Sequence, residues 1–254
     1  MTLFGVDGKT VLVTGGSRGI GMMIARGFAE AGARVLISSR KADQLEAAAT
    51  ELVVAAVQAD MTDADGISAV VSAVDEHFGG RLDVLVNNAG ASWGAPLEEF
   101  PESGWDKVLD TNAKGIFELT VALLGALREA ADPADPARVI NIGSVDGIRV
   151  PSLENYSYSA SKAAVHMLTR HLAKRLAAER ITVNAIAPGP FESKMTAFML
   201  GEPEARSAVE ATIPLGRIGE PDDVAGTAIF LASRAGAYLT ASVIALDGGY
   251  SGAG

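Results

Sequence analysis

The chain has 254 residues, of which 48% are apolar and 20% are charged, an ordinary globular mix that can bury a sizeable core. Its net charge of −10 argues against nucleic acid or an anionic membrane surface as the main partner. The absence of cysteine excludes disulfides, thiolate metal sites and a cysteine nucleophile, and we expect no bound metal. No apolar run approaches the ~20 residues of a membrane span, and the first residues lack a signal-peptide pattern, so we expect a cytoplasmic protein.

Apolar runs of strand length alternate with longer helical patterns along the whole chain. Most of these runs are continuously apolar and rich in Val and Ile, which is typical of a parallel sheet covered on both faces. The predicted strands are 10–14, 34–39, 53–58, 82–87, 138–142, 181–186 and 243–246. The predicted helices are 19–31, 43–51, 65–78, 103–130, 156–179 and 222–233. The βαβ alternation predicts a doubly wound α/β fold with a seven-stranded parallel sheet and helices on both faces, in a single domain over residues 1–254.

A glycine-rich stretch lies between the first predicted strand and the first predicted helix, where Gly15, Gly19 and Gly21 form the pattern G-x3-G-x-G. Glycines here permit a tight turn and let backbone N–H groups approach a pyrophosphate at the positive end of the helix. A plain turn is the alternative, but the place of the stretch in the first βαβ unit favours dinucleotide binding. The predicted cofactor contacts are Gly15, Ser17, Arg18, Gly19, Ile20 and Gly21.

The end of the second predicted strand indicates which dinucleotide is bound. In NAD sites an acidic residue at this point takes the ribose 2′-hydroxyl, whereas here the strand ends in Ser39, Arg40 and Lys41. The guanidinium groups of Arg40 and Arg18 suit a 2′-phosphate. We therefore expect NADP(H), with Ser39 and Arg40 among the residues that bind it.

Two long irregular segments, 91–104 and 188–219, follow predicted strands and leave from the edge of the sheet where ligands bind in open α/β folds. Segments of this length are usually lids or binding loops, and we interpret residues 188–219 as a substrate lid. The helical stretch 115–127 is apolar nearly all round, so it is either deeply buried or in contact with another subunit. We favour the subunit and expect a homo-oligomer, either a tetramer or a dimer.

Tyr158 and Lys162 are four residues apart in an amphipathic run, so both lie on one face of a helix. A cation close to a phenol favours the phenolate and lowers the pKa of the tyrosine. A phenol adjusted in this way can exchange a proton with an alcohol or a carbonyl group near neutral pH. Tyr156 is six residues from Lys162 and lies off its face, so we expect Tyr158 to be the acid.

Together these features resemble the short-chain dehydrogenase/reductase family along almost the whole chain. The matching motifs are TGGSRGIG at 14–21, NNAG at 87–90, Asn112, NIGS at 141–144, YSASK at 158–162, PG at 188–189 and DGG at 247–249. Each motif is weak alone, but seven in this order are specific. The resemblance implies a Rossmann-like fold and reversible hydride transfer between NADP(H) and a carbonyl or alcohol.

The resemblance also implies catalytic roles. Tyr158 would be the general acid, and Lys162 would lower its pKa and hold the nicotinamide ribose. Ser144 would donate a hydrogen bond to the substrate oxygen, and Asn112, in a helix distortion, would hold a water in a proton relay. Ser144 and Tyr158 are 14 residues apart, one more than in many relatives, which we interpret as a longer loop.

Further cofactor positions carry over from the family's motifs. Asp60 would contact the adenine with Met61 beside it, Asn87 and Gly90 would line the cofactor cleft, and Ser193 stands where the family usually has a threonine for the carboxamide. The remaining implied cofactor contacts are Ala89, Pro188, Gly189 and Phe191.

Within the family the chain is most similar to 3-ketoacyl reductases, which implies a 3-oxoacyl thioester or a similar ketone as the substrate. Asp135 and Glu179 stand where carrier-docking relatives have basic residues, which argues against an acyl carrier protein. The expected substrate wall consists of Trp93, Asp146, Val150, Phe191, Met195, Phe198 and Met199, beside Ser144. The alternative function is a non-catalytic NADP(H)-binding sensor or scaffold.

Overall fold

The computed structural model describes residues 2–252, which fold around a seven-stranded sheet with the order β3-β2-β1-β4-β5-β6-β7. Every neighbouring pair of strands is parallel. The strands are β1 (Thr10–Thr14), β2 (Arg34–Ser39), β3 (Ala55–Gln58), β4 (Val84–Asn87), β5 (Ala137–Ile142), β6 (Ile181–Pro188) and β7 (Val243–Leu246). The predicted doubly wound parallel α/β fold is confirmed.

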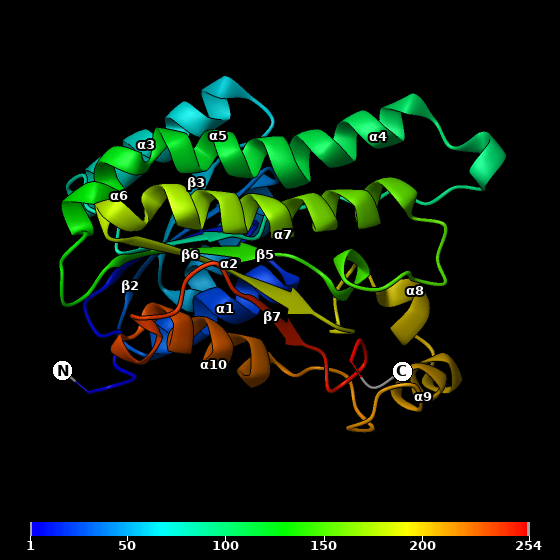
Figure 1. Ribbon diagram of the computed structural model, residues 1–254. Coiled ribbons are helices and arrows are strands. Elements are labelled where there is room, and N and C mark those ends of the chain that lie inside the picture. Colours follow the sequence, from blue (N-terminus) through cyan, green and yellow to red (C-terminus); the bar gives the residue numbers. More distant parts are fainter. Residues whose placement is uncertain (1, 253–254) are drawn as a thin grey trace.

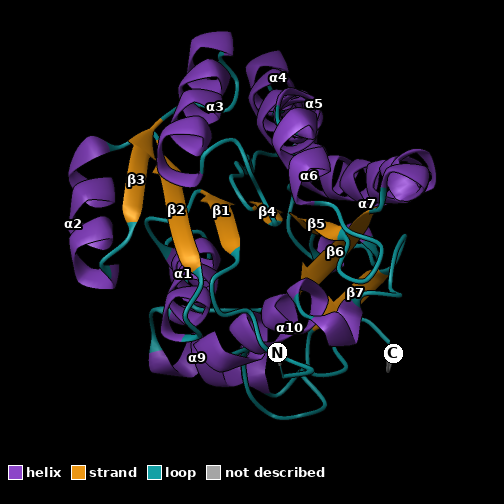
Figure 2. Cartoon of the chain, turned by 90° about the vertical axis from the view of Figure 1, so that its left-hand side faces the viewer, coloured by secondary structure: helices purple, strands orange, loops and turns teal. Residues whose placement is uncertain are grey.

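Helices cover both faces of the sheet (Figures 1 and 2). One layer contains α1 (Gly19–Glu30), α2 (Ala42–Leu52) and α10 (Pro221–Ala232), and its core includes Ile24, Phe28 and Leu231. The other layer contains α3 (Ala64–Phe78), α4 (Glu102–Leu109), α5 (Gly115–Ala122), α6 (Leu124–Ala130) and α7 (Tyr156–Leu176), with Val70, Leu123 and Leu172 in its core. Because both faces are covered, strands that are apolar on both sides are stable here.

The carboxyl ends of the strands point to the side of the molecule where the lid lies (Figure 1). The predicted lid, residues 188–219, contains two short helices, α8 (Ala197–Leu200) and α9 (Pro203–Glu210). A bridge between Phe191 and Gly219 joins its two ends. The lid is therefore a folded unit at the edge of the sheet where the site is expected.

Some predicted boundaries differ from the structure. Strands β3 and β4 each begin two residues later than expected, and β6 continues to Pro188. The single helix expected over residues 103–130 is wrong, because a π-helical turn at Asp110–Lys114 separates α4 from α5 and a break at Leu123 separates α5 from α6. Apolar spacing cannot detect these breaks, because the helix axis continues through both of them and the same face stays buried.

Helix α5 is buried on one side only. Ile116 and Leu119 are buried, whereas Phe117 and Val121 are each 46% exposed. Deep burial on all sides, one of the two alternatives for this apolar stretch, is therefore wrong. Contact with a second subunit stays a prediction. Among residues 2–252, we find no helix that is both long and apolar enough to cross a membrane.

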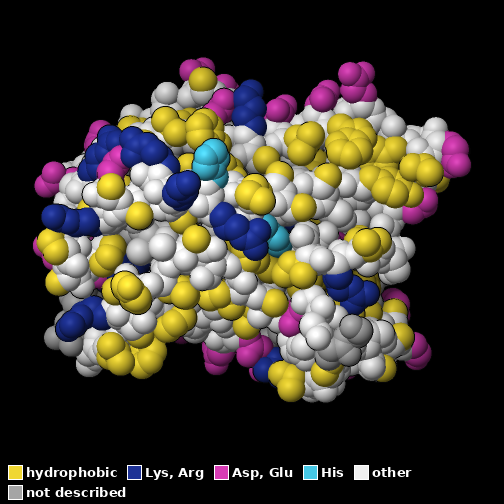
Figure 3. Space-filling model, in the orientation of Figure 1, with side chains coloured by type: hydrophobic (Ala, Val, Ile, Leu, Met, Phe, Trp, Pro, Cys, Tyr) yellow, Lys and Arg dark blue, Asp and Glu magenta, His cyan; other side chains and the backbone are white. Residues whose placement is uncertain are grey.

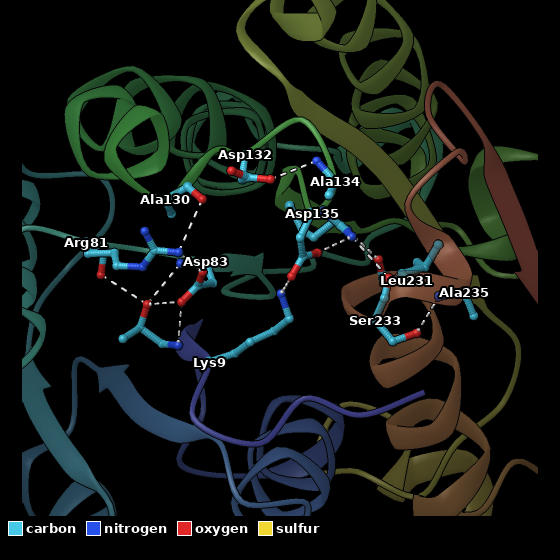
Figure 4. A network of polar contacts seen from close by, with 12 residues as sticks. Lys9, Arg81, Asp83, Ala130, Asp132, Ala134, Asp135, Leu231, Ser233 and Ala235 are labelled. Atoms are coloured by element: carbon cyan, nitrogen blue, oxygen red, sulfur yellow. Dashed lines mark hydrogen bonds and ion pairs between the residues drawn. The ribbon is translucent and has the colours of Figure 1, made fainter. Parts of the chain in front are cut away.

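A polar network fixes the amino ends of the strands (Figure 4). The buried guanidinium of Arg138 in β5 donates to the carboxylate of Asp135 at 3.0 Å and to the backbone carbonyls of Leu231 and Ser233, both at 3.0 Å. Lys9 donates to the other oxygen of Asp135 at 2.5 Å. The network joins β1, β5 and the end of α10 at the amino ends of the strands. The loops of the expected site lie at the opposite, carboxyl ends of the strands.

Candidate active site

Tyr158 and Lys162 both lie near the start of α7, which packs across β5 and β6. The Lys162 side chain is 4% exposed, and its Nζ donates to the backbone carbonyl of Ile142, at the end of β5, at 2.8 Å. The same Nζ lies 5.5 Å from the centre of the Tyr158 ring. The expected pairing of these two side chains on one helical face is present in the structure.

Ser144 follows β5 and faces Tyr158. The backbone N–H of Asp146 donates to the Ser144 hydroxyl oxygen at 3.1 Å, and this bond caps a short 3₁₀ turn at Val145–Gly147. A side-chain hydrogen bond with Ser144 lowers the pKa of Tyr158. The structure thus brings Ser144, Tyr158 and Lys162 together at the carboxyl end of β5.

The expected lowering of the Tyr158 pKa is wrong in its net direction, because the influences that raise this pKa prevail. Burial is the largest influence and raises the pKa of Tyr158 to about 12, and the negative charge of Asp146 also raises it. Burial lowers the pKa of Lys162 to about 8, and the charge of Asp146 opposes that change. Burial prevails because it penalises both the phenolate and the ammonium ion, while the Nζ is held at the Ile142 carbonyl. At pH 7 the site therefore holds a neutral phenol beside a lysine that is mostly cationic.

Asn112 lies in the π-helical turn, as expected, but its side chain is bound to protein groups. Its Oδ1 accepts from the backbone N–H of Ala91 at 2.8 Å, and its Nδ2 donates to the carbonyl of Ala91 and to the hydroxyl of Ser161, both at 2.9 Å. Ser161 in turn donates to the backbone carbonyl of Tyr158 at 2.7 Å. Asn112 thus connects the loop after β4 to the helical turn that carries Tyr158. The expected bound water stays a prediction.

Tyr156 lies away from this cluster. Its hydroxyl donates to the carboxylate of Glu154 at 3.1 Å, and its ring packs edge-on against Phe100 with 5.6 Å between the centroids. The structure therefore distinguishes the two tyrosines as the helical spacing predicted, with Tyr158 alone beside Ser144 and Lys162.

The glycine loop connects β1 to the amino end of α1. Gly15 has a positive φ of 64°, and a Cβ on it would lie 3.1 Å from the Cα of Ala89. A Cβ on Gly21 would overlap the Asn88 amide and the Gly15 carbonyl oxygen. No side chain caps α1, and its first turn has no acidic residue. These residues fit a dinucleotide, because a pyrophosphate can bind to the N–H groups at the uncapped amino end of α1.

Polar residues around the glycine loop provide the other cofactor positions. Ser17 in the loop donates to Ser39 at the end of β2 at 2.9 Å. Arg18 and Arg40 are exposed, and Arg40 lies 3.6 Å from the carboxylate of Asp60. Both guanidinium groups are free to turn toward a phosphate at the end of β2, which fits a 2′-phosphorylated cofactor.

Three of the expected cofactor contacts are not available as side chains. Asn87 is 2% exposed, and its amide donates to Thr120 at 3.2 Å and to Asn141 at 2.9 Å inside the protein. Phe191 is also 2% exposed, because its ring packs against Gly219, so its side chain is closed off from the cofactor and the substrate. A contact between its backbone and the cofactor stays a prediction. Met61 is buried in the core between α3 and α5. Sequence position gave their place near the site but not the direction of the side chains.

The other expected contacts lie at the same edge of the sheet. Gly90 lies close to Lys162, since a Cβ there would lie 3.9 Å from its Nζ. Ser193 lies against the glycine loop, where a Cβ on Gly19 would be 3.3 Å from that of Ser193. The remaining positions are Ile20 in the first turn of α1, Ala89 after β4, Pro188 at the end of β6 and Gly189 directly after it. Their contacts with the cofactor stay predictions.

The residues expected in the substrate wall differ in exposure. Trp93 packs over Gly104 and lies 5.4 Å from the Lys107 ammonium. Val150 is exposed between Ser144 and Tyr158, and Met195 and Phe198 are exposed in the lid, whereas Met199 packs partly buried within it. Asp146 is partly buried next to Ser144. Their contact with substrate stays a prediction.

Sequence reasoning missed Asn88 and Thr14. The Asn88 amide donates to the carbonyls of Thr14 and Gly15 at 2.9 and 3.1 Å, and the Thr14 hydroxyl accepts from the backbone N–H groups of Asn88 and Ala89, each at 3.0 Å. These bonds hold the glycine loop against the loop after β4. The alternation of side chains along a strand could have indicated that Asn87 and Asn88 point in opposite directions.

Comparison with known proteins agrees with this geometry. A family model described as enoyl-(acyl carrier protein) reductase matches residues 15–251. The rhamnolipids biosynthesis 3-oxoacyl-(acyl-carrier-protein) reductase of Pseudomonas aeruginosa is 49% identical over 251 residues, which cover 97% of this chain and 98% of that protein. The galactitol 2-dehydrogenase (L-tagatose-forming) of Cereibacter sphaeroides is 38% identical over 255 residues, which cover 98% of each.

A solved structure has the same fold with a bound cofactor. The NADP active-site complex of RhlG from Pseudomonas aeruginosa is 49% identical, matches with a TM-score of 0.95 and covers 99% of each chain. The expected likeness to 3-ketoacyl reductases and the expected NADP(H) are confirmed. The chain is therefore an NADP(H)-dependent oxidoreductase that acts on alcohol and carbonyl groups, and it belongs to the short-chain dehydrogenase/reductase family.

Proposed function

We propose that this enzyme reduces the ketone of a 3-oxoacyl thioester, or of a similar compound, to the hydroxy product, with Tyr158 as the general acid. The observation that carries the proposal is the meeting of Ser144, Tyr158 and Lys162 at the carboxyl end of β5, next to the glycine loop. Only at this edge do the polar groups needed for the chemistry and a place for the cofactor adjoin each other among the described residues.

When it is bound, NADPH supplies the hydride for the carbonyl carbon. Ser144 is suited to hold the carbonyl oxygen, because its own oxygen already accepts from the Asp146 N–H, and the proton that it shares with Tyr158 can be donated to a substrate oxygen that lies between the two hydroxyl groups. Tyr158 is suited to protonate that oxygen, because a pKa raised to about 12 keeps its phenol neutral at pH 7. The positive charge of Lys162 stabilises the phenolate left after proton transfer.

The same residues support the binding of the cofactor. One Lys162 proton is used at the Ile142 carbonyl, and the other two are available for the hydroxyl groups of a ribose. The glycine loop supplies N–H groups for the pyrophosphate, and Arg40 with Arg18 supplies positive charge for a 2′-phosphate.

Exposed apolar side chains support an acyl substrate. Val150 and Leu153 lie in the segment that joins Ser144 to Tyr158, and Met195 and Phe198 lie in the lid. The similar Pseudomonas protein is named as a reductase of acyl-carrier-protein substrates. At the amino edge of the sheet, however, the Arg138 guanidinium is buried and Glu179 is bound to Arg128 and Arg175, while Arg180 is exposed. The net charge of −10 opposes the approach of an acidic carrier. We therefore propose a thioester with a small handle, such as coenzyme A.

A non-catalytic NADP(H) sensor is not favoured. A protein that only binds the cofactor needs neither the buried Lys162 nor the hydrogen bond between Ser144 and Tyr158, and the burial of an ammonium ion is costly.

We also propose that the protein is a cytoplasmic homo-oligomer. Exposed hydrophobic side chains gather along α4, α5 and α7, which face the viewer in Figures 1 and 3. They include Trp105, Leu109, Phe117, Val121 and Met167.

Light scattering should give the mass of a dimer or a tetramer, and Phe117→Glu should lower the measured mass. A wild-type monomer at micromolar concentration would contradict this proposal.

A substrate panel tests the reaction. NADPH absorbance should fall with acetoacetyl thioesters of coenzyme A and of acyl carrier protein, with a faster reaction for coenzyme A. An enoyl thioester and a set of cyclic and linear ketones are the other arms. Tyr158→Phe should lower kcat by about 10²- to 10⁴-fold while NADPH binding, measured by fluorescence, is retained. Unchanged turnover in Tyr158→Phe would remove the mechanism, and a faster reaction with the enoyl thioester would replace the substrate class.

Arg40 provides a test of cofactor recognition. Loss of a charge-assisted contact to phosphate costs about 1.5–3 kcal/mol, so Arg40→Ala should raise the Michaelis constant for NADPH about 10- to 100-fold and leave that for NADH unchanged. Arg175→Ala, which removes an exposed guanidinium at the opposite edge of the sheet, is the matched control. Equal effects of Arg40→Ala on both cofactors would show that Arg40 does not read the 2′-phosphate.

A further inference from the structure

The geometry points to Asp146 as a positioning residue, whose carboxylate holds the Ser144 turn against the start of α7 and places a negative charge beside Tyr158 and Lys162. This inference rests on the proposed function, because it concerns how the same proton donor is held and kept in its working protonation state.

The backbone of Asp146 fixes the Ser144 hydroxyl. Its N–H donates to Ser144 Oγ at 3.1 Å, and the turn closes through the N–H groups of Gly147 and Ile148, which donate to the carbonyls of Ser144 and Val145 at 3.0 and 2.9 Å. The position of the Asp146 backbone therefore decides where the Ser144 proton can point.

The side chain of Asp146 then joins this turn to α7. Its Oδ2 accepts from Nδ2 of Asn155 at 3.1 Å, and the Asn155 side chain is 9% exposed. The Asn155 Oδ1 and backbone carbonyl accept from the hydroxyl and the N–H of Ser159, both at 3.1 Å. Asp146 is thus two hydrogen bonds from the first turn of α7, which carries Tyr158.

The exposed part of the intervening chain contributes little to this connection by packing. Ile148, Val150 and Leu153 are all exposed, with Val150 at 88%. This is also the segment that is one residue longer than expected between Ser144 and Tyr158. At its start the segment packs on α7, since a Cβ on Gly147 would lie 2.7 Å from the Lys162 backbone. The polar contact of Asp146 with Asn155 adds to this packing in fixing the distance between Ser144 and Tyr158.

The charge of Asp146 acts on the same two groups. Burial raises the pKa of Asp146, while the Asn155 hydrogen bond and the charges of Arg149 and Lys162 lower it. Its negative charge raises the pKa of both Lys162 and Tyr158. The other ionisable groups nearby are His166, whose pKa is lowered to about 4 by burial and by Lys162, and Tyr250, which stacks behind Arg149 at 4.1 Å. His166 is neutral at pH 7 and adds no charge beside Lys162. The negative charge of Asp146 is therefore the one that offsets the cost of burying the Lys162 ammonium.

The sign of the pH effect follows from this arrangement. Lys162 is a cation below its pKa of about 8 and loses its proton as the pH rises. Without the negative charge of Asp146, that loss occurs at lower pH, and so does ionisation of Tyr158. The alkaline limb of kcat/KM for reduction should then move to lower pH by on the order of one unit.

Asp146→Asn separates charge from contact, because the amide oxygen can still accept from Asn155. We expect its alkaline limb to move down, with kcat at pH 6.5 reduced by less than about tenfold. Asp146→Ala removes both the charge and the hydrogen bond with Asn155, so its kcat should fall further than that of Asp146→Asn. Asn155→Ala keeps the charge, so its limb should stay near the wild-type position while kcat falls. Glu76→Gln, which removes an exposed carboxylate on α3, should match the wild type.

Profiles of kcat/KM against pH for these variants and for Tyr158→Phe decide the matter, with melting temperature and NADPH binding as checks on folding. An alkaline limb that stays in place in whichever of Asp146→Asn and Asp146→Ala is folded overturns the inference. A limb that moves as far in Asn155→Ala as in Asp146→Asn also overturns it, since the charge would then have no part. Full turnover in Tyr158→Phe would instead overturn the proposed function, whatever the Asp146 variants do.

Discussion

The hydrogen bond from the Lys162 ammonium to the Ile142 carbonyl joins α7 to the end of β5, and the arrangement of the site depends on it. Burial of an ammonium ion is unfavourable, and the pKa of Lys162, lowered to about 8, expresses that cost. The packing of α7 on β5 and β6 and the charge of Asp146 offset it. Because Lys162 is fixed in this way, the Tyr158 phenol, one helical turn earlier, is fixed beside Ser144.

The two edges of the sheet have different roles. At the amino edge Arg138, Asp135 and Lys9 close the structure with buried ionic contacts, which hold β1, β5 and the end of α10 in register. At the carboxyl edge the strands end in loops, among them the glycine loop and the turn that follows Ser144, and the lid lies beside them. The amino edge is held rigid, and the loops and the lid at the carboxyl edge can vary in sequence. The proton donors Ser144 and Tyr158 keep their positions because they are anchored to this rigid scaffold.

Much of this could be predicted from the sequence, because its patterns report backbone periodicity and spacing. Apolar runs indicated the parallel sheet, and a spacing of four placed Tyr158 beside Lys162. Side-chain direction and solvation were harder to predict. The Asn87 side chain points into the protein, and Asn88 is the residue that holds the glycine loop. The Phe191 side chain is buried in the core. Burial raises the pKa of Tyr158, although a neighbouring cation was expected to lower it. These outcomes depend on what packs around each group, which spacing does not encode.

We propose that the Ser144, Tyr158 and Lys162 cluster carries out hydride reduction of a carbonyl group. The most direct test uses NADPH labelled with deuterium at the transferring carbon, an acetoacetyl thioester, and mass spectrometry of the product. The product should carry one deuterium on the new carbinol carbon, from one face of the nicotinamide, and Tyr158→Phe should form labelled product about 10²- to 10⁴-fold more slowly. A hydroxy product without deuterium, or labelled product formed by Tyr158→Phe at the wild-type rate, would contradict this proposal.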